Sequence, residues 1–489
     1  MPLDPNSEWH RPSNPWRAII RHALCETPGL VWVFPAAAVP GPTLWRVMRG
    51  WVEYLRELGI APGDRLVLAG TPDLGWVGAI LAGLWLEATL VLLPTGDDPE
   101  ATAELLDARL VIGSTGQVAW DEHGEPQRRG AFRPIRDGGN PEVRFLLRTS
   151  GTGGDARWFA LSDANVLAVL ASHLPVLGLD RTHRLLSTLP WSHAFGLVLE
   201  FLAALRAGSS LVRCAVPADP VEQIRLARTW KLDWWCAVPA MTRRIAAEPE
   251  GHVVLAALRG GIVGGAALTA ETCALLAGTR LRVGYGQTEA SPGIMLGAPG
   301  EFVPDLLGRP VGCAVRLGEG GGIEFCGANA CLGRWPLANK TAEDPARPPW
   351  LDTGDLGRMA GEDYYFCGRR DDLIRLDNGR TLSALGCERR LKECSPDVGE
   401  TMLWSTDGQV LSLVFTGVAP KVTVIEECLG ALASRVRLLP RVAIETWRFT
   451  PKGEIDRVAL RRQFSQPSSL SDVSLSRIEP SPIPENSGE

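Results

Sequence analysis

Roughly the first 310 residues alternate short apolar runs with longer stretches of helical periodicity. The apolar runs, with turn residues nearby, predict strands at Arg65–Ala69, Thr89–Leu93, Arg109–Ile112, Arg184–Thr188, Ser210–Arg213 and Leu281–Gly284. Helices are expected between them, at Trp45–Leu58, Asn165–Leu174, Leu197–Arg206 and Val221–Thr229. Strand–helix alternation predicts an α/β fold with mostly parallel sheets covered by helices. Ligands of such sheets bind on loops near the carboxyl ends of the strands.

The pattern changes after about Gly308, where glycines and short strand-like runs take over. We expect a large N-terminal domain at 1–367, with a β-rich subdomain at about 308–367 that includes strands Ala314–Arg316 and Gly322–Cys326. A small α+β C-terminal domain is expected at 368–464, with strands Val410–Phe415 and Val442–Thr446 and helices Leu385–Glu393 and Val424–Ala433. The tail at 465–489 is rich in Ser and Pro and is expected to be disordered.

Composition narrows the class of protein. The chain has 489 residues, a charged fraction of 22% and a net charge of −6, so nucleic acid is not expected as a partner. The 11 cysteines are scattered without a C-x-x-C pair, which favours reduced thiols in a cytoplasmic protein over a zinc site or a disulfide framework. Residues Leu74–Leu93 are the best membrane candidate, but Glu87 and several glycines favour a buried helix that runs into a strand, and no membrane span is expected.

Four segments carry candidate chemistry. The first, Thr149-Ser150-Gly151-Thr152-Gly153-Gly154, follows the apolar run Val143–Leu147. Small and hydroxyl residues let backbone amides turn inward as a nest for phosphate, and no Gly-Lys-Ser/Thr follows, so the loop is not a Walker motif. A flexible surface turn is the alternative.

The second segment, Pro190–Gly196, places His193 after a buried strand, where it could contact a substrate carboxylate; a structural histidine is the alternative. The third, Val283–Glu289, offers the flat face of Tyr285 for a purine, the hydroxyl of Thr288 for a phosphate and the carboxylate of Glu289 for Mg²⁺.

The fourth segment runs from Trp350 to Gly357 and is followed by Tyr365–Ile374. An aspartate such as Asp355 can accept hydrogen bonds from both hydroxyls of a ribose. A pair of Asp/Gly surface turns is the alternative.

The order and spacing of these segments resemble the adenylate-forming, AMP-binding superfamily of acyl-CoA synthetases, peptide-synthetase adenylation domains and luciferases. The resemblance covers roughly residues 15 to 463 and is strongest to acyl and aryl acid ligases. It rests on the phosphate loop Thr149–Gly154, Pro190–Gly196, Val238-Pro239, Gly264-Gly265, Tyr285–Glu289, Thr353–Asp355 and Gly368–Asp372. It implies that the protein uses ATP and Mg²⁺ to activate a small-molecule carboxylic acid as an acyl-adenylate. The acyl group would then pass to a thiol, either of CoA or of the phosphopantetheine on an acyl carrier protein.

The resemblance also implies a role for each matching residue. The phosphate loop would wrap the β- and γ-phosphates through Thr149, Ser150 and Thr152, with Gly151, Gly153 and Gly154. The adenine would lie against Gly264, Gly265, Ala266, Tyr285 and Gly286. Thr288 would contact the α-phosphate and Glu289 would bind Mg²⁺, while Asp355 and Arg369 would hold the ribose. Asp371 would be the hinge about which a mobile C-terminal lid rotates.

Two positions depart from the family. In the phosphate loop, Arg157 stands near the place of the usual lysine and keeps its charge. In the segment Thr450–Arg457, Glu454 stands where the family has the lysine that reaches the α-phosphate during adenylation. A like charge at about 4 Å and an effective dielectric near 20 costs on the order of 4 kcal/mol, or roughly a thousandfold in rate.

Three hypotheses follow from Glu454. Lys452 could substitute, because residues two apart in an extended segment share a face and lie about 6.6 Å apart. Alternatively, adenylation is slow or lost while the thioester-forming step survives, or the protein binds a nucleotide or acyl-adenylate without turnover.

The segment after His193 bears on the substrate. Amino-acid-activating relatives usually have an aspartate here for the α-ammonium, whereas Phe195–Leu199 is free of charge and Glu200 is the first acid. An apolar pocket favours a fatty or aromatic acid. A final acceptor other than a thiol, such as an amine or an internal hydroxyl, is a further alternative.

Overall fold

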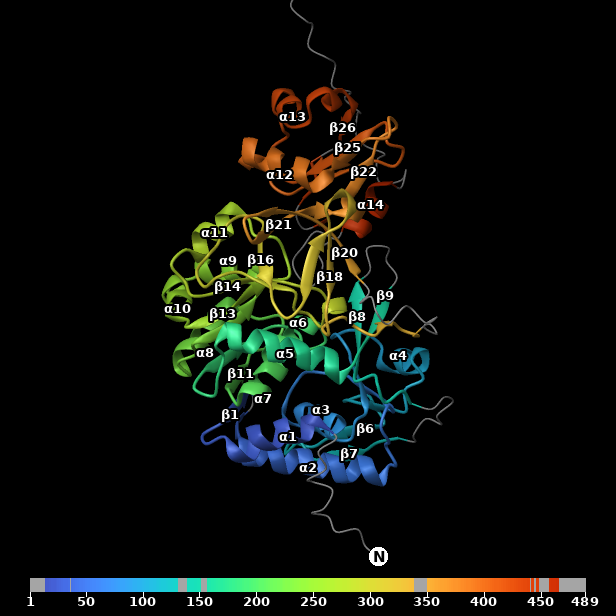
Figure 1. Cartoon of the computed structure of the whole chain (residues 1–489), viewed down its shortest axis with the longest axis vertical. Helices are drawn as coiled ribbons and strands as arrows, with labels where there is room; N and C mark the ends of the chain where they lie inside the picture. Colours follow the sequence, from blue (N-terminus) through green and yellow to red (C-terminus); the bar gives the residue numbers. More distant parts are fainter. Residues whose placement is uncertain are drawn as a thin grey trace, which may run out of the picture.

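Two sheets, each with a parallel centre and antiparallel edges, form the larger part of the molecule, and a smaller α+β unit follows them (Figure 1). The structure is a computed structural model that describes residues 14–35, 37–130, 139–150, 156–337, 350–439, 441–443, 446–447 and 457–465. The expected disordered tail lies outside these residues, apart from position 465. The architecture confirms the predicted α/β class.

The larger sheet has 13 strands in the order β17-β18-β20-β21-β16-β15-β14-β13-β12-β10-β11-β1-β2. Its strands from β14 to β1 are parallel, and the others pair in antiparallel fashion. The strands are β1 Val31–Phe34, β2 Ala37–Pro40, β10 Arg184–Ser187, β11 Ser210–Arg213, β12 Trp234–Ala237, β13 Gly260–Gly264, β14 Arg282–Tyr285, β15 Met295–Leu296, β16 Leu306–Pro310, β17 Ala314–Leu317, β18 Gly322–Cys326, β20 Leu351–Ala360 and β21 Asp363–Arg369. The centres of the parallel strands are mainly apolar because both faces of the sheet are covered there.

The second sheet has eight strands in the order β19-β9-β8-β4-β3-β5-β6-β7, and its centre, from β8 to β6, is parallel. These strands are β3 Arg65–Leu68, β4 Thr89–Leu92, β5 Leu110–Ile112, β6 Val118–Trp120, β7 Pro126–Arg128, β8 Phe145–Ser150, β9 Ala156–Leu161 and β19 Gly333–Arg334. The predicted parallel strands are therefore confirmed, and they divide between two sheets.

Helices cover both sheets and fill the space between them. They are α1 Pro15–Arg21, η2 His22–Glu26, α2 Gly41–Glu57, α3 Leu74–Trp85, α4 Pro99–Leu105, α5 Asp163–Leu177, α6 Ala194–Gly196, η3 Leu197–Leu202, α7 Ala203–Ala207, α8 Pro220–Thr229, α9 Pro239–Ala247, α10 Gly251–Ala257, α11 Ala270–Leu276, η4 Thr288–Ala290 and η5 Glu319–Gly321. Helix α3 is buried from Gly75 to Trp85, as expected of an apolar helix that leads into a strand. Within the described residues, none of the helices combines the length and apolarity that a membrane crossing requires.

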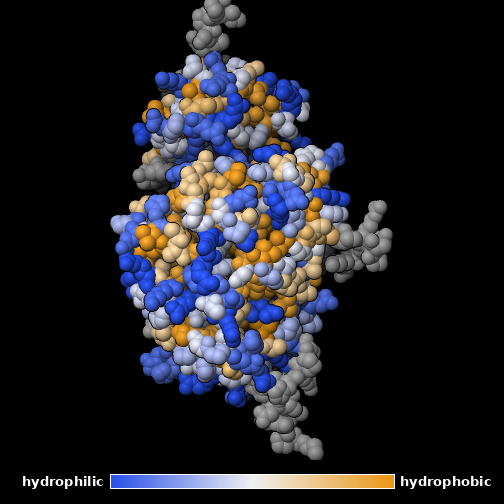
Figure 2. Space-filling model, turned by 60° about the vertical axis from the view of Figure 1, so that its left-hand side comes forward, coloured by the Kyte–Doolittle hydropathy of each residue, from blue (hydrophilic) through white to orange (hydrophobic). Residues whose placement is uncertain are grey.

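The C-terminal unit forms a distinct lobe at the top of Figures 1 and 2. Its elements are η6 Arg370–Asp372, β22 Leu373–Arg375, β23 Thr381–Ser383, α12 Ala384–Cys394, η7 Pro396–Val398, β24 Thr401–Trp404, β25 Leu411–Phe415, α13 Val422–Leu429, η8 Gly430–Arg435, β26 Val436–Leu438 and α14 Arg457–Ser465. The hydrophobic clusters of this lobe start at Ile374, whereas those of the body end at Phe366. The proposed domain boundary at Gly368 falls between them.

One predicted strand, Val442–Thr446, is wrong in the part that the structure describes. The third strand of the lobe's sheet is β26, which pairs with β25 in parallel. Val442 still donates its amide to Phe415, but none of the described residues at 441–443 and 446–447 belongs to a strand.

Candidate active site

The carboxyl ends of β13 and β14 form a ledge of glycines. A Cβ on Gly264 would lie 2.4 Å from the carbonyl oxygen of Gly284, and one on Gly286 would lie 1.4 Å from that of Pro292. Gly265 has φ +84°, a backbone conformation that favours glycine. Ala266 follows it and is half-buried. Close approach of neighbouring backbone therefore requires glycine at positions 264 and 286.

Three predicted ribose- and adenine-binding residues meet beside this ledge. The phenolic hydroxyl of Tyr285 donates to Asp355 Oδ2 at 2.8 Å. Arg369 Nε lies 3.1 Å from Asp355 Oδ1, and the two residues are directly opposite each other on β20 and β21. Burial raises the pKa of the Asp355 carboxyl, and Arg369 opposes that rise. One hydrogen bond, from Tyr285, and one ion pair, with Arg369, thus hold the carboxylate at the strand end.

Thr288 and Glu289 follow in the short helix η4, and both are half-buried. The carbonyl oxygen of Glu289 accepts the amide of Cys331 at 2.8 Å. Directly afterwards, Gly333 pairs with Ala160 of β9. The segment 331–334 therefore ties the Glu289 turn in the larger sheet to the β8–β9 hairpin in the second sheet.

The β8–β9 hairpin carries the predicted phosphate loop. Thr149 and Ser150 end β8, and Thr149 lies opposite Arg157 in the antiparallel register, so both side chains belong to one face. Gly151, Thr152, Gly153 and Gly154 lie outside the described residues. The register supports the expectation that Arg157 brings its charge to this loop.

His193 is half-buried at the amino end of α6. Its amide donates to the carbonyl of Pro190 at 3.1 Å, and its carbonyl accepts the amide of Leu197 at 2.9 Å. Gly196 lets α6 approach this turn, because a Cβ there would lie 2.5 Å from the oxygen of Pro190.

Glu200, the first acid after the histidine motif, is fully buried in the π-helical η3. Its carboxylate lies 3.8 Å from the buried guanidinium of Arg213. Burial raises the pKa of Glu200 to about 7 and lowers that of Arg213 to about 10, and each group partly opposes the shift of the other. This pair was not predicted from the sequence, where Glu200 reads only as a charge in an apolar run.

The proposed hinge Asp371 is exposed in η6, two residues after Arg369. Its neighbour Asp372 lies 3.2 Å from Arg457 Nε, and Arg457 also donates to both oxygens of Glu388 at 2.8 and 2.6 Å. Arg457 follows the segment that holds Lys452 and Glu454, which are outside the described residues. The end of that segment is therefore anchored beside the hinge, a link that no spacing in the sequence indicates.

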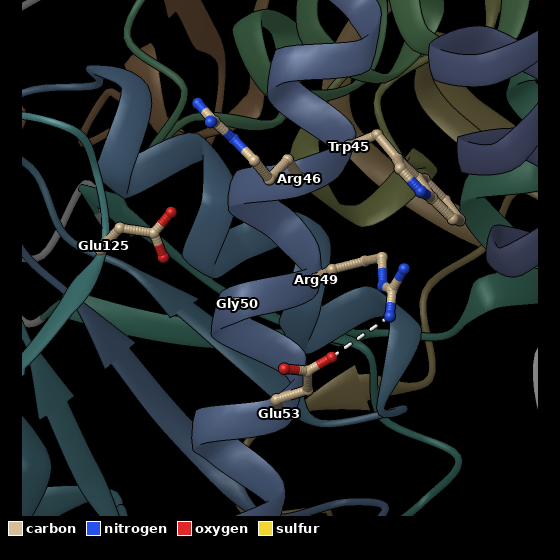
Figure 3. Close-up of a pocket in the computed structure, with 6 residues that line it drawn as sticks. All are labelled: Trp45, Arg46, Arg49, Gly50, Glu53 and Glu125. Atoms are coloured by element: carbon tan, nitrogen blue, oxygen red, sulfur yellow. Dashed lines mark hydrogen bonds and ion pairs between the residues drawn. The ribbon is translucent and has the colours of Figure 1, made fainter. Parts of the chain in front are cut away.

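A shallow hollow of about 310 Å³ lies elsewhere, on the outer side of α2 (Figure 3). Arg46, Arg49 and Glu53 project from the helix, Arg49 pairs with Glu53 at 3.4 Å, and Glu125 faces the helix across the hollow. None of its lining residues belongs to the candidate site.

Comparisons with known proteins bear on the family and the fold. A family model described as AMP-binding enzyme matches residues 52–320. Feruloyl-CoA synthase from Amycolatopsis sp is 27% identical over 376 residues, which cover 69% of this chain and 74% of that protein. The crystal structure of ATP-bound MatB from Rhodopseudomonas palustris superposes with a TM-score of 0.77 at 18% identity, over 91% of this chain and 99% of that chain. That of o-succinylbenzoate CoA synthetase from Bacillus subtilis, in complex with ATP and magnesium ion, has a TM-score of 0.74 at 19% identity, over 91% of this chain and 99% of that chain.

Proposed function

The chain belongs to the family of AMP-binding enzymes, and we propose that it activates a fatty or aromatic carboxylic acid with ATP and transfers the acyl group to a thiol. The acceptor would be CoA or the phosphopantetheine of a carrier protein. The observation that supports this proposal most directly is the Tyr285–Asp355–Arg369 cluster at the ledge of Gly264 and Gly286. Three motifs far apart in the sequence meet there, which supports the proposal of a purine and ribose site.

In the first half-reaction, a carboxylate oxygen of the acid attacks the α-phosphorus of ATP and pyrophosphate leaves. Tyr285 would stack on the adenine, and Asp355 would accept the ribose hydroxyls. Thr288 would donate to the α-phosphate, while Thr149 and Ser150 would hold the outer phosphates. In the second half-reaction, the thiol sulfur attacks the acyl carbon and AMP leaves. Positioning and neutralisation of charge are the main contributions of such a site.

Glu289 suits Mg²⁺. No cluster of three His, Cys, Asp or Glu side chains suited to a metal occurs among the described residues. Mg²⁺ commonly takes one or two carboxylates together with substrate phosphates, which is what the Glu289 turn offers beside the β8–β9 hairpin. When bound, the ion would neutralise phosphate charge.

The neighbourhood of His193 supports the proposed substrate class. Glu200 is the first acid after the histidine motif, but it is fully buried and occupied by Arg213, Ser187 and backbone amides. It has no free oxygen for an ammonium group. An uncharged fatty or aromatic tail therefore fits better than an amino acid.

Adenylation requires a cation in place of the missing lysine, and we assign that role to Lys452. The second candidate function is binding of a nucleotide or acyl-adenylate without turnover. The presence of Glu454 favours it, because a carboxylate repels the developing phosphate charge.

The test is acid-dependent ATP–pyrophosphate exchange across a panel of fatty, aromatic and amino acids, with wild type and Glu454→Lys. Exchange by the wild type with fatty or aromatic acids supports the proposal and identifies the acid. Exchange by Glu454→Lys alone would overturn it and favour the binding function. Product that forms without an added thiol would indicate another acceptor.

A further inference from the structure

The loop that carries His193 is closed at its base by two side chains. Ser187, the last residue of β10, donates its hydroxyl to Glu200 Oε2 at 2.6 Å. Glu200 lies 13 residues further on, in the π-helical turn η3. A π-turn inside a helix shifts the positions that follow it and is frequent at functional sites. Ser187 and Glu200 therefore bracket the whole Pro190–Gly196 motif.

Glu200 and its ion-pair partner Arg213 also hold the backbone of the residues that lead into this loop. The amides of Thr188 and Leu189 donate to Glu200 Oε1 at 3.1 and 3.3 Å. The carbonyl of Leu189 accepts from Arg213 Nη1 at 2.7 Å. Both polar groups of Leu189, beyond the end of the strand, are thus satisfied by charged side chains from other elements. The bond from Arg213 to the Leu189 carbonyl is charge-assisted, and such bonds are about twice as strong as neutral ones.

From Leu189 the contacts continue towards His193. Trp191 donates its indole N–H to Ser187 at 3.0 Å, and the guanidinium of Arg213 lies 4.5 Å from the centre of its ring. Trp191 is 1% exposed, so its ring is fixed. The next turn, from Pro190 to His193, is closed by the backbone bond described above. A continuous chain of contacts therefore connects Glu200 and Arg213 to His193.

A contribution to stability does not by itself explain the buried Glu200–Arg213 pair. Buried ion pairs lose much of their attraction to desolvation, and apolar replacements are often as stable. The Glu200–Arg213 pair, by contrast, directs four of its contacts to Ser187–Leu189, the residues that lead into the loop: the Ser187 hydroxyl, two amides and one carbonyl.

We propose that Glu200 and Arg213 are positioning residues that set the Pro190–Gly196 loop, and through it His193, against the carboxylic acid. This inference rests on the proposed function. Neither residue touches substrate; they act through the backbone of Thr188 and Leu189. Loss of the pair should weaken the use of the acid and leave the nucleotide site, on β13, β14 and β20, intact.

The experiment compares Glu200→Leu, Glu200→Gln and Asp64→Leu in the exchange assay. Asp64 is a matched control because it is 5% exposed, accepts a backbone amide and pairs with Arg109 at the amino end of β3. We expect Glu200→Leu to raise KM for the acid at least tenfold with KM for ATP within twofold, and Glu200→Gln to raise it less. Asp64→Leu should lower Tm with both KM values unchanged.

An acid KM within twofold of wild type for Glu200→Leu, or an equal rise in acid KM for Asp64→Leu, overturns the inference. If Glu200→Leu does not fold, Glu200→Gln replaces it: an acid KM more than twofold above wild type supports the inference, and one within twofold overturns it.

Hydrogen exchange of the full-length protein separates failure of this inference from failure of the proposed function. A wild type that exchanges no pyrophosphate with any acid disproves the ligase activity. Whether or not the wild type catalyses pyrophosphate exchange, the backbone amides of Trp191, Ser192 and His193 should exchange their hydrogens at least tenfold faster in the Glu200 variant that folds than in wild type or Asp64→Leu. Unchanged exchange at these amides would overturn the positioning role.

Discussion

Tyr285 donates its hydroxyl to Asp355 across 2.8 Å, although the two residues are 70 positions apart in the sequence. The contact joins the end of the parallel strand β14 to the antiparallel strand β20. In the proposed complex, the ring of Tyr285 covers the adenine while the carboxylate beside it accepts the ribose hydroxyls. The hydrogen bond therefore sets the spacing between the two halves of a nucleoside site.

Substitution of Asp355 by Asn should weaken ATP binding by roughly 10- to 100-fold, because hydrogen bonds to a charged group contribute about 1.5–3 kcal/mol. Calorimetric titration with ATP and with its 2′,3′-dideoxy analogue measures the effect. Only ATP should lose affinity, because the analogue lacks both hydroxyls. Asp352→Asn, an exposed neighbour on β20 that pairs with Arg370, is the control. Equal losses for both ligands would show that Asp355 does not hold the ribose.

The Gly286→Ala variant should disturb the adenine ledge. Its Cβ would lie 1.4 Å from the carbonyl oxygen of Pro292, so the loop between them must move. Such overpacking costs about 1–3 kcal/mol, and we expect a lower Tm together with at least tenfold weaker ATP binding. At Gly130 the nearest atom to an added Cβ is 3.5 Å away, so Gly130→Ala should change neither. ATP affinity of Gly286→Ala within twofold of wild type would contradict the assignment.

Lys452 should be essential only while Glu454 is present. We expect Lys452→Ala to lower pyrophosphate exchange at least 100-fold in the wild-type background, since no other cation then takes the lysine's role. In the Glu454→Lys background, where the family's lysine is restored, the same substitution should cost less than tenfold. The two measurements form a double-mutant cycle. Equal losses in both backgrounds would mean that Lys452 does not substitute for the missing residue.

The stability of the protein should depend on pH through Glu200. Burial raises its pKa from 4.5 to about 7, and Arg213 on β11 opposes the rise. The thiol of Cys236 on β12 also faces it, but burial raises the pKa of that thiol well above 9.0, so it stays protonated. At pH values between 4.5 and about 7, the folded protein keeps a proton on Glu200 that the unfolded chain releases. The free energy of unfolding, relative to Glu200→Gln, should therefore fall by about 3 kcal/mol as pH rises from about 4.5 to about 7, and then level off.

Urea unfolding of both proteins from about pH 5 to about pH 8 measures this difference. A constant difference over the whole range would show that Glu200 titrates as it does in the unfolded chain.

Parallel strands were predictable because they are buried on both faces. Arg184–Thr188, for example, is read as a strand from its apolar run and becomes β10. Helix 197–206 was also predicted, but its π-turn was not. The turn places Glu200 beside Arg213. Arg213 lies on a strand 13 residues further along, and local periodicity cannot predict such a partner.

The candidate site shows the same limit. Tyr285 and Asp355 were paired in function only through the family resemblance, because no spacing rule relates residues from a parallel and an antiparallel strand. Arg457 and Glu388 are 69 positions apart, and neither residue type indicates its partner. Ion pairs and hydrogen bonds between distant elements depend on the packed geometry, which periodicity does not encode.

Arg369, Asp371 and Asp372 lie within four consecutive residues, so the proposed ribose contact, the hinge and the partner of Arg457 share one short piece of backbone. A rotation of the lid at Asp371 would twist the chain directly beside Arg369. Nucleotide affinity and lid orientation are then thermodynamically linked, and the coupling is reciprocal. A ligand that strengthens the Arg369 contact would bias the lid, and a partner that captures the lid in one orientation would tighten or loosen the grip on AMP by the same factor.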